Sequence, residues 1–450
     1  MTKDKKVEIA KWLLDPDKRF ELPNDWNFLE KKLNENSLKK VFEEIEIPLW
    51  PILNDVKGVG IKVDKDKLIA ISAKLTKKSE EIQKDIYKKI GKEFSDLNLN
   101  SPKQLSHFLF DLPPVGLGLK DGGVSKTKSG NFSVDVNTLT LLYDQHPIVP
   151  LLIKYREISK IQSTYIEPLK NLADQNSRVH TTFLQMGAAT GRFSSRDPNL
   201  QNVPKEIRDV FVSEKGCSLV AIDYSQIELR ILASVSSDQK MIEAFRKGID
   251  IHALTASQIL NKDINKITPK ERNFAKTLNF GIVYGMGPLA FAKAANLDIN
   301  KAREFINGYF KFSEIKRYQE KIISSARQLG YVENLNGRKR WVPDIISNNF
   351  RARKEAERAV INMPIQGLAA DIIKLAMIKV ANVLKLKKLW MTKVRLLLTI
   401  HDELLFEISD DILHSIIPVL QTEMEAIYKL KVPLIVNVSL GKRWGALRNF

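Results

Sequence analysis

The sequence contains 450 residues, of which 44% are hydrophobic and 28% charged, a composition that fits a globular protein and excludes a disordered or collagen-like chain. At about 150 residues per domain, this length predicts roughly three domains. Lysine and arginine number 71 against 53 acidic residues, and the resulting formal charge of +18 favours a polyanionic partner, either nucleic acid or an anionic membrane surface.

Two further observations narrow these possibilities. No apolar run approaches the ~20 residues that a membrane-spanning helix needs, and the N-terminus lacks a signal-peptide pattern, so nucleic acid is favoured over membrane. Cys217 is the only cysteine, which excludes intramolecular disulfides and cysteine-based zinc sites. The sequence therefore predicts a protein of the cytosol or of a similarly reducing compartment.

The first half of the chain is predicted to be largely helical. Its first forty-odd residues are too few for a domain and are interpreted as a helical remnant or docking arm. Apolar residues at helical spacing predict long helices over residues 65–89 and 151–173, with a Gly/Pro/Lys-rich loop over 113–130 between them. Two basic helices joined by a loop are consistent with an ordinary helical hairpin and also with an arm that closes on a phosphate backbone.

The second half mixes strands and helices. Residues 181–204 begin like a strand and continue as a loop rich in Arg, Ser, Asn and Gln, and residues 217–234 read as an apolar strand that runs into a helix. Helices are predicted to dominate from there to about residue 381. Residues 393–409 then predict two β-strands with His401, Asp402 and Glu403 at their tight connection.

Acidic residues at strand ends are the first candidates for chemistry. Asp223 directly follows four apolar residues, and a carboxylate that ends a buried strand is costly unless it is paired or ligated. The alternative is a helix N-terminus, since Ser225-x-x-Glu228 has the spacing of a capping box. Asp402 and Glu403 occupy a hairpin turn where Asn-Gly or Asp-Gly is usual. Magnesium needs only one or two protein carboxylates, so Asp223 and Asp402 would suit a two-metal site.

Residues 267–287 form the third candidate segment. Thr268, Pro269 and Glu271 predict an N-cap, a proline at the first helical position and a capping-box partner, and glycines at 285 and 287 predict the helix end. Further along this helix, one stripe places two cations before two aromatic residues at intervals of four: Arg272, Lys276, Phe280 and Tyr284. The stripe suits a nucleoside triphosphate, although a solvated basic turn followed by core aromatics has the same pattern.

Taken in order, these segments resemble the A-family DNA polymerases, the group typified by bacterial DNA polymerase I. DYSQIELR (223–230) is similar to that family's motif A, RNFAKTLNFGIVYG (272–285) to motif B and HDE (401–403) to motif C. TGRFSSRDPNLQNVP (190–204) and ERAVINMPIQGLAADI (357–372) match two further blocks. The resemblance extends over roughly residues 45–450.

The resemblance implies an α+β protein with the right-hand polymerase fold, in which an antiparallel palm sheet is combined with helical fingers and a helical thumb. The implied divisions are a remnant of an exonuclease-like domain or N-terminal arm (1–44), palm entry (45–62), thumb (63–165), palm with motif A (166–235), fingers with motif B (236–348) and palm with motif C (349–450). It also implies template-directed addition of dNTPs to a primer 3′ end by two-metal-ion nucleotidyl transfer.

By the same resemblance, Asp223, Asp402 and the Tyr224 carbonyl bind two Mg²⁺ ions, for which Mn²⁺ can substitute, and Glu403 is an auxiliary acid. Arg272, Lys276 and His252 contact the triphosphate, and Lys276 also protonates the leaving pyrophosphate. Phe280 lies by the incoming sugar, Tyr284 lies by the templating position, and Glu228 excludes the ribose 2′-hydroxyl. The positions that match primer or template contacts are Arg192, Asn199, Gln201, Asn202, Arg358, Asn362, Gln366 and His401.

Amide and guanidinium donors suit these DNA contacts because the minor groove offers acceptors at similar places on every base pair. Asn199 and Asn202 have an alternative role as loop caps beside Pro198 and Pro204. The implied partners are primer-template DNA and dNTPs, with no membrane partner, and the implied protein is a monomer of the cytoplasm, associated with the nucleoid.

The family's proofreading nuclease has no counterpart in the short segment before residue 45, so we expect no exonuclease activity from these residues. Two rival functions are a single-subunit RNA polymerase and a non-catalytic, basic DNA-binding relative. Glu228 argues against the RNA polymerase, because this position excludes ribose in the DNA enzymes. The intact Asp223, Asp402, Arg272 and Lys276 argue against a non-catalytic relative.

Overall fold

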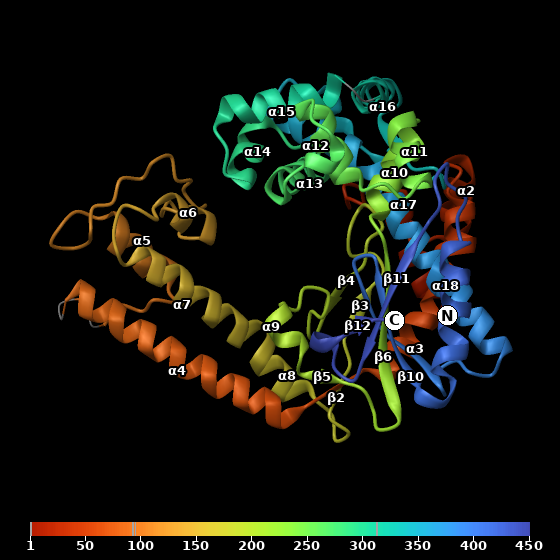
Figure 1. Cartoon of the computed structure of the whole chain (residues 1–450), viewed down its shortest axis with the longest axis horizontal. Coiled ribbons are helices and arrows are strands. Elements are labelled where there is room, and N and C mark those ends of the chain that lie inside the picture. The colour runs from red at the N-terminus through yellow and green to blue at the C-terminus, as the bar shows by residue number, and fades with distance from the viewer. Residues whose placement is uncertain (1, 92–93, 95, 312–313) are drawn as a thin grey trace. The chain divides into compact units, whose positions relative to one another are not determined.

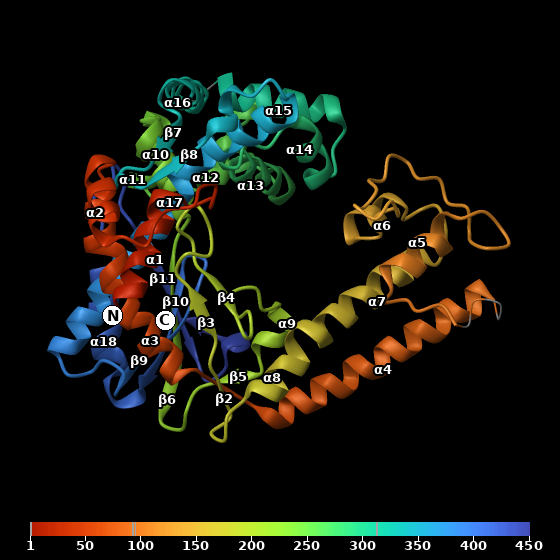
Figure 2. The same cartoon turned by 180° about the vertical axis from the view of Figure 1, so that it is seen from behind.

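A computed structural model describes residues 2–91, 94, 96–311 and 314–450 (Figures 1 and 2). The chain divides into two compact units. Unit 1 consists of Met1–Ile61, His180–Asn202 and Val212–Phe450, and unit 2 consists of Lys62–Val179 and Val203–Phe211. Across the described ranges, no helix combines the length and apolarity that crossing a lipid bilayer requires.

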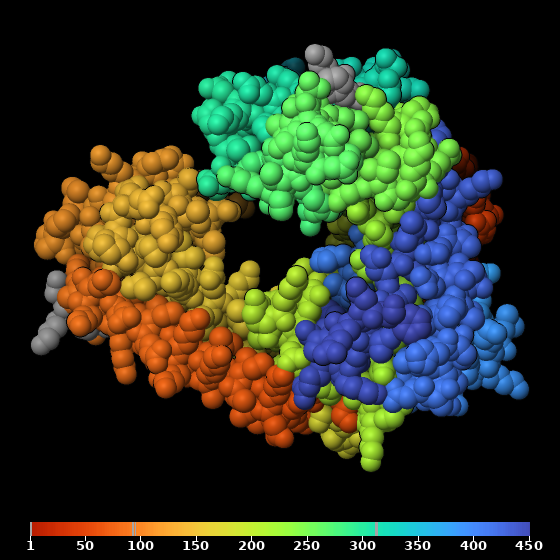
Figure 3. Space-filling view, viewed as in Figure 1, coloured from red at the N-terminus to blue at the C-terminus, as the bar shows by residue number. Residues whose placement is uncertain are grey.

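The centre of unit 1 is a five-stranded antiparallel sheet with the strand order β12-β11-β6-β10-β9. Its strands are β6 (Cys217–Tyr224), β9 (Val394–Ile400), β10 (Glu403–Ser409), β11 (Val436–Gly441) and β12 (Arg448–Asn449). Residues 219–222 of β6 are buried because this strand is central, which explains their unbroken apolar run. The predicted strand from residue 217 and the predicted hairpin over 393–409 are confirmed, and the C-terminal residues lie on the surface (Figure 3).

Helices surround this sheet. Both views show α11 to α16 gathered beyond one end of the sheet, with α3, α17 and α18 beside it (Figures 1 and 2). The longest helix, α17, has 37 residues and packs against α3, α10, α16 and α18. The α-helices that follow β6 are α10 (Ile227–Ser236), α11 (Gln239–Arg246), α12 (Ile251–Leu260), α13 (Pro269–Val283), α14 (Pro288–Ala295), α15 (Ile299–Lys311), α16 (Ile315–Leu329), α17 (Phe350–Leu386) and α18 (Leu413–Glu425).

Two short hairpins were not predicted. β3 (Thr182–Leu184) pairs with β4 (Ser194–Arg196), so residues 185–193 form a hairpin loop where a longer irregular segment was expected. β7 (Tyr331–Glu333) pairs with β8 (Lys339–Trp341) inside a region expected to be helical. Gly330, at a φ of +75°, ends α16 just before β7, and Gly337, at a φ of +85°, lies in the turn between β7 and β8; both conformations favour glycine.

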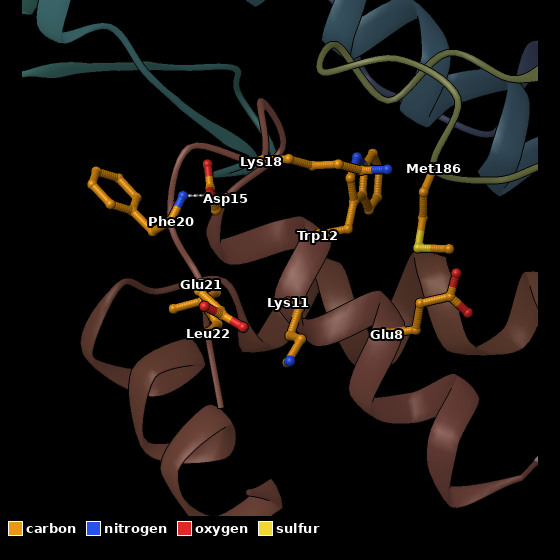
Figure 4. A pocket seen from close by; sticks show the side chains of 9 residues that line it. All are labelled: Glu8, Lys11, Trp12, Asp15, Lys18, Phe20, Glu21, Leu22 and Met186. Carbon is orange, nitrogen blue, oxygen red and sulfur yellow. Dashed lines mark hydrogen bonds between the residues drawn. The ribbon is translucent and has the colours of Figure 1, made fainter. Parts of the chain in front are cut away.

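The N-terminal segment is helical, as expected, and is an integral part of unit 1. It forms α1 (Lys3–Leu14), α2 (Trp26–Glu35), the π-helical turn η1 (Val41–Glu46) and α3 (Ile47–Val59). The first three share one apolar core, against which Met186 and Leu375 also pack. A pocket of about 310 Å³ lies between α1, residues 15–22 and Met186 (Figure 4). None of its nine lining residues is among the predicted site residues.

Unit 1 also contains four charged side chains that are almost completely inaccessible to solvent, Glu46, Arg338, Asp371 and Lys374, here called the buried charge cluster. Arg338 Nε lies 2.9 Å from Asp371 Oδ1, and its Nη2 also contacts Glu46. Lys374 Nζ lies 2.7 Å from Glu46 Oε1. The charges of the two cations and the two anions cancel, and such pairing is what makes the burial of charged side chains possible.

The electrostatics of the cluster follow from this balance. Burial opposes ionisation of Glu46, but Lys374 and Arg338 outweigh it, so the pKa of this carboxyl lies below its usual value. For Arg338 burial is likewise outweighed, by Asp371 and Glu46, and its pKa is raised. The charged forms of Glu46 and Arg338 are therefore maintained by their opposite partners, whereas burial of Lys374 outweighs the attraction of Glu46 and lowers the pKa of this amine.

Unit 2 is mainly helical. The predicted helix over 65–89 is α4 (Lys65–Ile90), and residues 113–130 are largely irregular, as predicted. The predicted helix over 151–173 is α7 (Val149–Ile161), a π-helical segment η3 (Gln162–Ile166) and α8 (Glu167–Leu172). The other elements are α5 (Pro102–Phe110), α6 (Val136–Leu141), α9 (Lys205–Arg208), and a small sheet of β1 (Ile61–Val63), β2 (Arg178–Val179) and β5 (Phe211–Val212), whose residues fall mainly in this unit.

The buried charge cluster generates a stability prediction. Arg338→Met leaves Glu46 and Asp371 buried with one cation between them, and breaking such a buried pair costs about 3–5 kcal/mol of unfolding free energy. Arg340, which lies on β8 two residues after Arg338, donates to Asp17 at 2.9 Å but is partly exposed, so we expect Arg340→Met to cost about 0–1 kcal/mol. Urea denaturation of both variants measures the difference. Equal destabilisation by the two substitutions would contradict the prediction.

Candidate active site

Strand pairing brings the predicted carboxylates together. Asp223, at the end of β6, lies directly opposite Glu403, the first residue of β10. Asp402 precedes Glu403 in a two-residue turn after β9, and its backbone carbonyl accepts a hydrogen bond from Tyr224 N at 3.1 Å. Residues opposed in an antiparallel pair have Cβ atoms about 4.5–5.5 Å apart. Motifs from distant parts of the sequence therefore meet where β6 ends and β10 begins, at one end of the sheet.

This cluster of carboxylates has excess negative charge. Burial, together with Glu403 and Asp402, raises the pKa of Asp223 to about 7. Burial also raises the pKa of Asp402, an effect that the charge of Arg192 partly offsets. Within the described ranges, the Asp223 and Asp402 carboxylates form no hydrogen bond or ion pair. A partly buried carboxylate without a hydrogen-bond or ion-pair partner is unfavourable, so the site fits a hard cation that would supply the missing positive charge.

The described residues include no group of three or more His, Cys, Asp or Glu side chains placed to hold a metal ion. Magnesium does not require such a group, because it takes oxygen ligands, keeps several waters and uses substrate phosphates beside one or two carboxylates. Asp223 and Asp402 together with a backbone carbonyl therefore remain a suitable donor set. Tyr224 itself is buried, and its hydroxyl donates to Met424 O at 2.7 Å.

Glu228 does not form the capping box that its spacing from Ser225 allowed. α10 begins at Ile227, its N-cap is Gln226 in the left-handed conformation, and no side chain caps it. Glu228 Oε1 instead accepts from Arg192 Nη2 at 2.5 Å and Oε2 from the Tyr284 hydroxyl at 2.7 Å. Burial raises the pKa of Glu228, while Arg192 and Tyr284 act in the opposite direction. The capping interpretation is wrong because the carboxylate turns away from the helix start.

The stripe on α13 is present in the structure. Thr268 caps the helix in a capping box with Glu271, Pro269 is its first residue, and Gly285 follows its end with a φ of +64°. These local predictions are confirmed. Lys276 is exposed and, among the described residues, has no hydrogen bond or ion pair. Tyr284 connects the stripe to Glu228, so motif B meets motif A through one hydrogen bond.

Two further members of this region are held from α12. Asp250 caps α12 through the backbone N–H groups of His252 and Ala253, and its other oxygen accepts from Arg272 Nε at 2.6 Å. His252 is 3% exposed, and its ring centre lies 5.8 Å from that of Phe280. Asn279 Nδ2 lies 3.0 Å from His252 Nδ1, which assigns the proton of the neutral ring to Nε2. Burial lowers the pKa of His252 to about 4.

The predicted DNA-contact residues fall in four places, which are α17, the loop after β4, the turn before β10 and the β3–β4 hairpin loop that carries Arg192. Arg358, Asn362 and Gln366 recur at intervals of four on α17 and so share one face, and Asn362 Oδ1 is buried without a hydrogen-bond partner among the described atoms. The loop after β4 carries Asn199, Gln201 and Asn202.

Their surroundings differ. Asn199 Oδ1 accepts from Ser195 Oγ and Gln201 N, which is the loop-cap role, while Gln201 Nε2 donates to Thr399 O at 3.3 Å. Asn202 is exposed. His401 is exposed in the turn before Asp402, with a φ of +53°.

Sequence reasoning missed Asp250 and Asn279. Asp250 had a signal, because an aspartate immediately before a helical run is a preferred N-cap, although nothing indicated its contact with Arg272. Asn279 is completely buried on α13, and no local pattern distinguishes it from a core residue. The Arg192–Glu228 pair joins two separate motifs and could not be inferred from either.

Comparison with a solved structure identifies the fold. The polymerase domain of Pol1 from M. smegmatis, in complex with DNA primer-template and dNTP, matches 98% of this chain and is covered to 82% of its own length, with a TM-score of 0.88 and 33% sequence identity. The predicted fold class, an α+β right-hand polymerase fold with an antiparallel palm sheet, is thereby confirmed.

Sequence comparisons identify the family. The model of DNA polymerase family A matches residues 65–446, and the chain belongs to this family. Its relatives include DNA polymerase I of Caldicellulosiruptor bescii (44% identical over 93% of this chain), DNA polymerase I of Bacillus subtilis (42% over 92%) and the thermostable DNA polymerase I of Thermus aquaticus (39% over 94%). The aligned regions are 49%, 47% and 50% of those proteins, so the chain spans about half their length.

The environment of His252 generates a prediction about pH. With a pKa of about 4, the imidazole should stay neutral down to about pH 5, whereas in the unfolded chain it titrates near 6.5. Because the folded pKa is the lower one, this histidine contributes stability above pH 6.5 that is lost as the pH falls towards 4. Nitrogen-15 NMR of the imidazole should show the Nε2-protonated tautomer at pH 6. A folded-state titration near 6.5 would contradict the assignment.

Proposed function

We propose that this chain is a template-directed DNA polymerase that adds dNTPs to a primer 3′ end by two-metal-ion nucleotidyl transfer. The observation that supports this most directly is the meeting of Asp223 and Asp402 at one end of the central strands, where both are partly buried, form no hydrogen bond or ion pair with described residues, and have raised pKa values. Family membership supports the same reaction, as does the DNA- and dNTP-bound state of the matched Pol1 domain.

In this proposal Asp223, Asp402 and the Tyr224 carbonyl hold two Mg²⁺ ions, which Mn²⁺ could replace, and Glu403 lies beside them as an auxiliary acid. Bound divalent ions lower the pKa of an attacking hydroxyl and neutralise charge on the leaving phosphate. The protein's own part is to fix the carboxylates through the β6–β10 pairing. Lys276, exposed and available, would protonate the departing pyrophosphate.

The residues of α13 and its neighbours would bind the nucleotide. Arg272 and Lys276 supply positive charge for the triphosphate, and the Asp250 carboxylate orients the Arg272 guanidinium. His252 carries no charge at neutral pH, so its contribution would be a hydrogen bond from Nε2. Phe280 would lie by the sugar and Tyr284 by the templating base, with Glu228 excluding a 2′-hydroxyl.

The DNA would be held by the residues predicted from the resemblance, which are Arg192, Asn199, Gln201, Asn202, Arg358, Asn362, Gln366 and His401. Positive charge spread over the chain favours binding to phosphates independently of sequence. The domain divisions predicted from the sequence remain part of the proposal, with thumb over 63–165 and fingers over 236–348. The proposal includes a monomer that acts on DNA in the cytoplasm, at the nucleoid.

Absence of proofreading by these 450 residues is also part of the proposal. The described residues before β1 form helices, and none of them places paired carboxylates on a strand. A primer-extension assay with dNTPs or rNTPs, with and without Mg²⁺, tests the whole proposal. Magnesium-dependent extension by dNTPs alone supports it, extension by rNTPs favours an RNA polymerase, and DNA binding without extension favours a non-catalytic relative. Shortening of a 5′-labelled mismatched primer without dNTPs would refute the absence of proofreading.

The carboxylates generate the first functional prediction. Asp223→Asn or Asp402→Asn removes a negatively charged ligand of the cations that would neutralise the developing phosphate charge. The extension rate should therefore fall at least ~10³-fold. DNA binding should persist, because scattered lysines and arginines dominate affinity. Asp411→Asn is the control, since Asp411 is exposed beyond the other end of β10, where it pairs with Lys393. Single-turnover extension and gel-shift titration measure both properties, and substantial extension by either site variant would place the metal site elsewhere.

The environment of Glu228 generates a second functional prediction. If the side chain closes the space beside the sugar, Glu228→Ala should raise the efficiency of rCTP insertion relative to dCTP by about tenfold or more. Glu228→Gln keeps the volume and the Tyr284 hydrogen bond while it removes the charge paired with Arg192, so it should retain most of the discrimination. The ratio of kcat/KM values for dCTP and rCTP opposite guanine is the measurement. An unchanged ratio in Glu228→Ala would rule out the steric role.

A further inference from the structure

We infer that the buried charge cluster is a positioning element for the candidate active site. The cluster fixes the β3–β4 hairpin loop so that Arg192 holds Glu228 in place. This inference rests on the proposed function for its catalytic readout. The members of the buried charge cluster lie outside every motif by which the site was predicted, except that Asp371 falls within the 357–372 block. The proposed reaction itself does not require these four buried charges.

The cluster contacts both ends of the hairpin loop. At its beginning, Gln185 Nε2 donates to the Glu46 carboxylate at 2.5 Å and to the Glu46 backbone carbonyl at 2.7 Å. At its end, the ring of Phe193 lies 5.3 Å from Lys374 Nζ, a cation–π contact. The loop is thus fixed at residues 185 and 193, which are its first and last residues.

Gly191 also packs closely against the cluster. A methyl group at this position would lie 3.0 Å from Arg338 Nε and 3.1 Å from its Cζ, and the φ of +89° is one that favours glycine. The loop backbone therefore rests directly on the Arg338 guanidinium. Arg192 lies between Gly191 and Phe193, so both of its chain neighbours touch the cluster.

From this position in the loop, Arg192 Nη2 donates to Glu228 Oε1 at 2.5 Å. Glu228 is 4% exposed and also accepts from Tyr284, so its orientation depends on Arg192 on one side and Tyr284 on the other. A shift of the loop would move the guanidinium and leave the carboxylate with one partner. The cluster would then act on sugar selection through Arg192, without touching the nucleotide.

The same cluster gives the N-terminal segment a role. Glu46 belongs to η1, and the indole of Trp12 on α1 lies 5.3 Å from both Arg338 and Lys374. Figure 4 shows Met186 of the hairpin loop pointing towards the helix that carries Trp12. The N-terminal helices are thereby joined to the loop through the cluster and through this pocket wall.

The test is a double-mutant cycle on the ratio of kcat/KM for dCTP to that for rCTP. Arg338→Met and Arg192→Ala should each lower this ratio by about threefold or more, and the double variant should lower it no further than Arg192→Ala alone. Melting temperatures should fall further in the double variant than in Arg192→Ala, because the loss of stability does not act through Arg192. Arg340→Met, two residues after Arg338 but paired with Asp17 and not with the cluster or with Arg192, should leave the ratio unchanged.

A second variant keeps all four charges. Gly191→Ala should lower the ratio as Arg338→Met does, because the added methyl group displaces the loop. Gly216→Ala is its matched control, since Gly216 has a similar φ of +78° and nothing within 4 Å of the added group. An unchanged ratio in Gly191→Ala and Arg338→Met, with lowered melting temperatures, would overturn the inference and leave the cluster a purely structural feature.

Amide hydrogen exchange separates this inference from the proposed function. Residues 185–193 should exchange faster in Arg338→Met and Gly191→Ala, and at the native rate in Arg340→Met and Gly216→Ala, whether or not the protein extends primers. Native exchange of the loop in the first pair would refute the anchoring itself. Absence of extension by the unaltered chain would instead refute the polymerase proposal and leave the exchange result standing.

Discussion

The antiparallel pairing of β6 with β10 is the constraint on which the candidate site depends. The register places Asp223 opposite Glu403, and the turn that precedes β10 places Asp402 next to both. A slip of one residue would turn the carboxylates to the other face of the sheet, because side chains alternate along a strand. The buried Glu407 of β10 resists such a slip, since its carboxylate accepts from Glu214 N, just before β6, and from Arg395 Nη1 of β9, both at 2.9 Å. Contacts at the far end of these strands therefore help to determine the geometry of the site.

Buried charge occurs in this protein in two contrasting forms. In the buried charge cluster two cations and two anions satisfy one another, and the pKa values of Glu46 and Arg338 shift in the directions that keep them ionised. Where β6 ends and β10 begins, the Asp223 and Asp402 carboxylates form no hydrogen bond or ion pair with described residues, and the pKa of Asp223 rises to about 7. The first arrangement is complete in itself. The second is completed only by positive charge from outside the chain, which is the property of a site for cations and phosphates.

Local features were predictable because they depend on neighbours in sequence. The capping box of Thr268 and Glu271, the end of α13 at its glycines, the helix over 65–89 and the hairpin around His401 and Asp402 all follow from short-range patterns. The order of five motifs then indicated the family and the right-hand fold. The β7–β8 hairpin was missed because its strands have three residues each, too few for an alternating pattern to stand out.

The sequence by itself determined the elements, the family and which side chains were candidates, since each of these is encoded in residue type and spacing. Only the tertiary structure decided what those side chains contact. Glu228 matched a capping box by spacing, yet its carboxylate is held by Arg192 and Tyr284 from two other segments. Arg338, one of the most buried side chains in the described chain, lies in a stretch that reads as ordinary basic surface. The reason is physical: burial and pairing depend on contacts between segments far apart in sequence, and no local pattern records them.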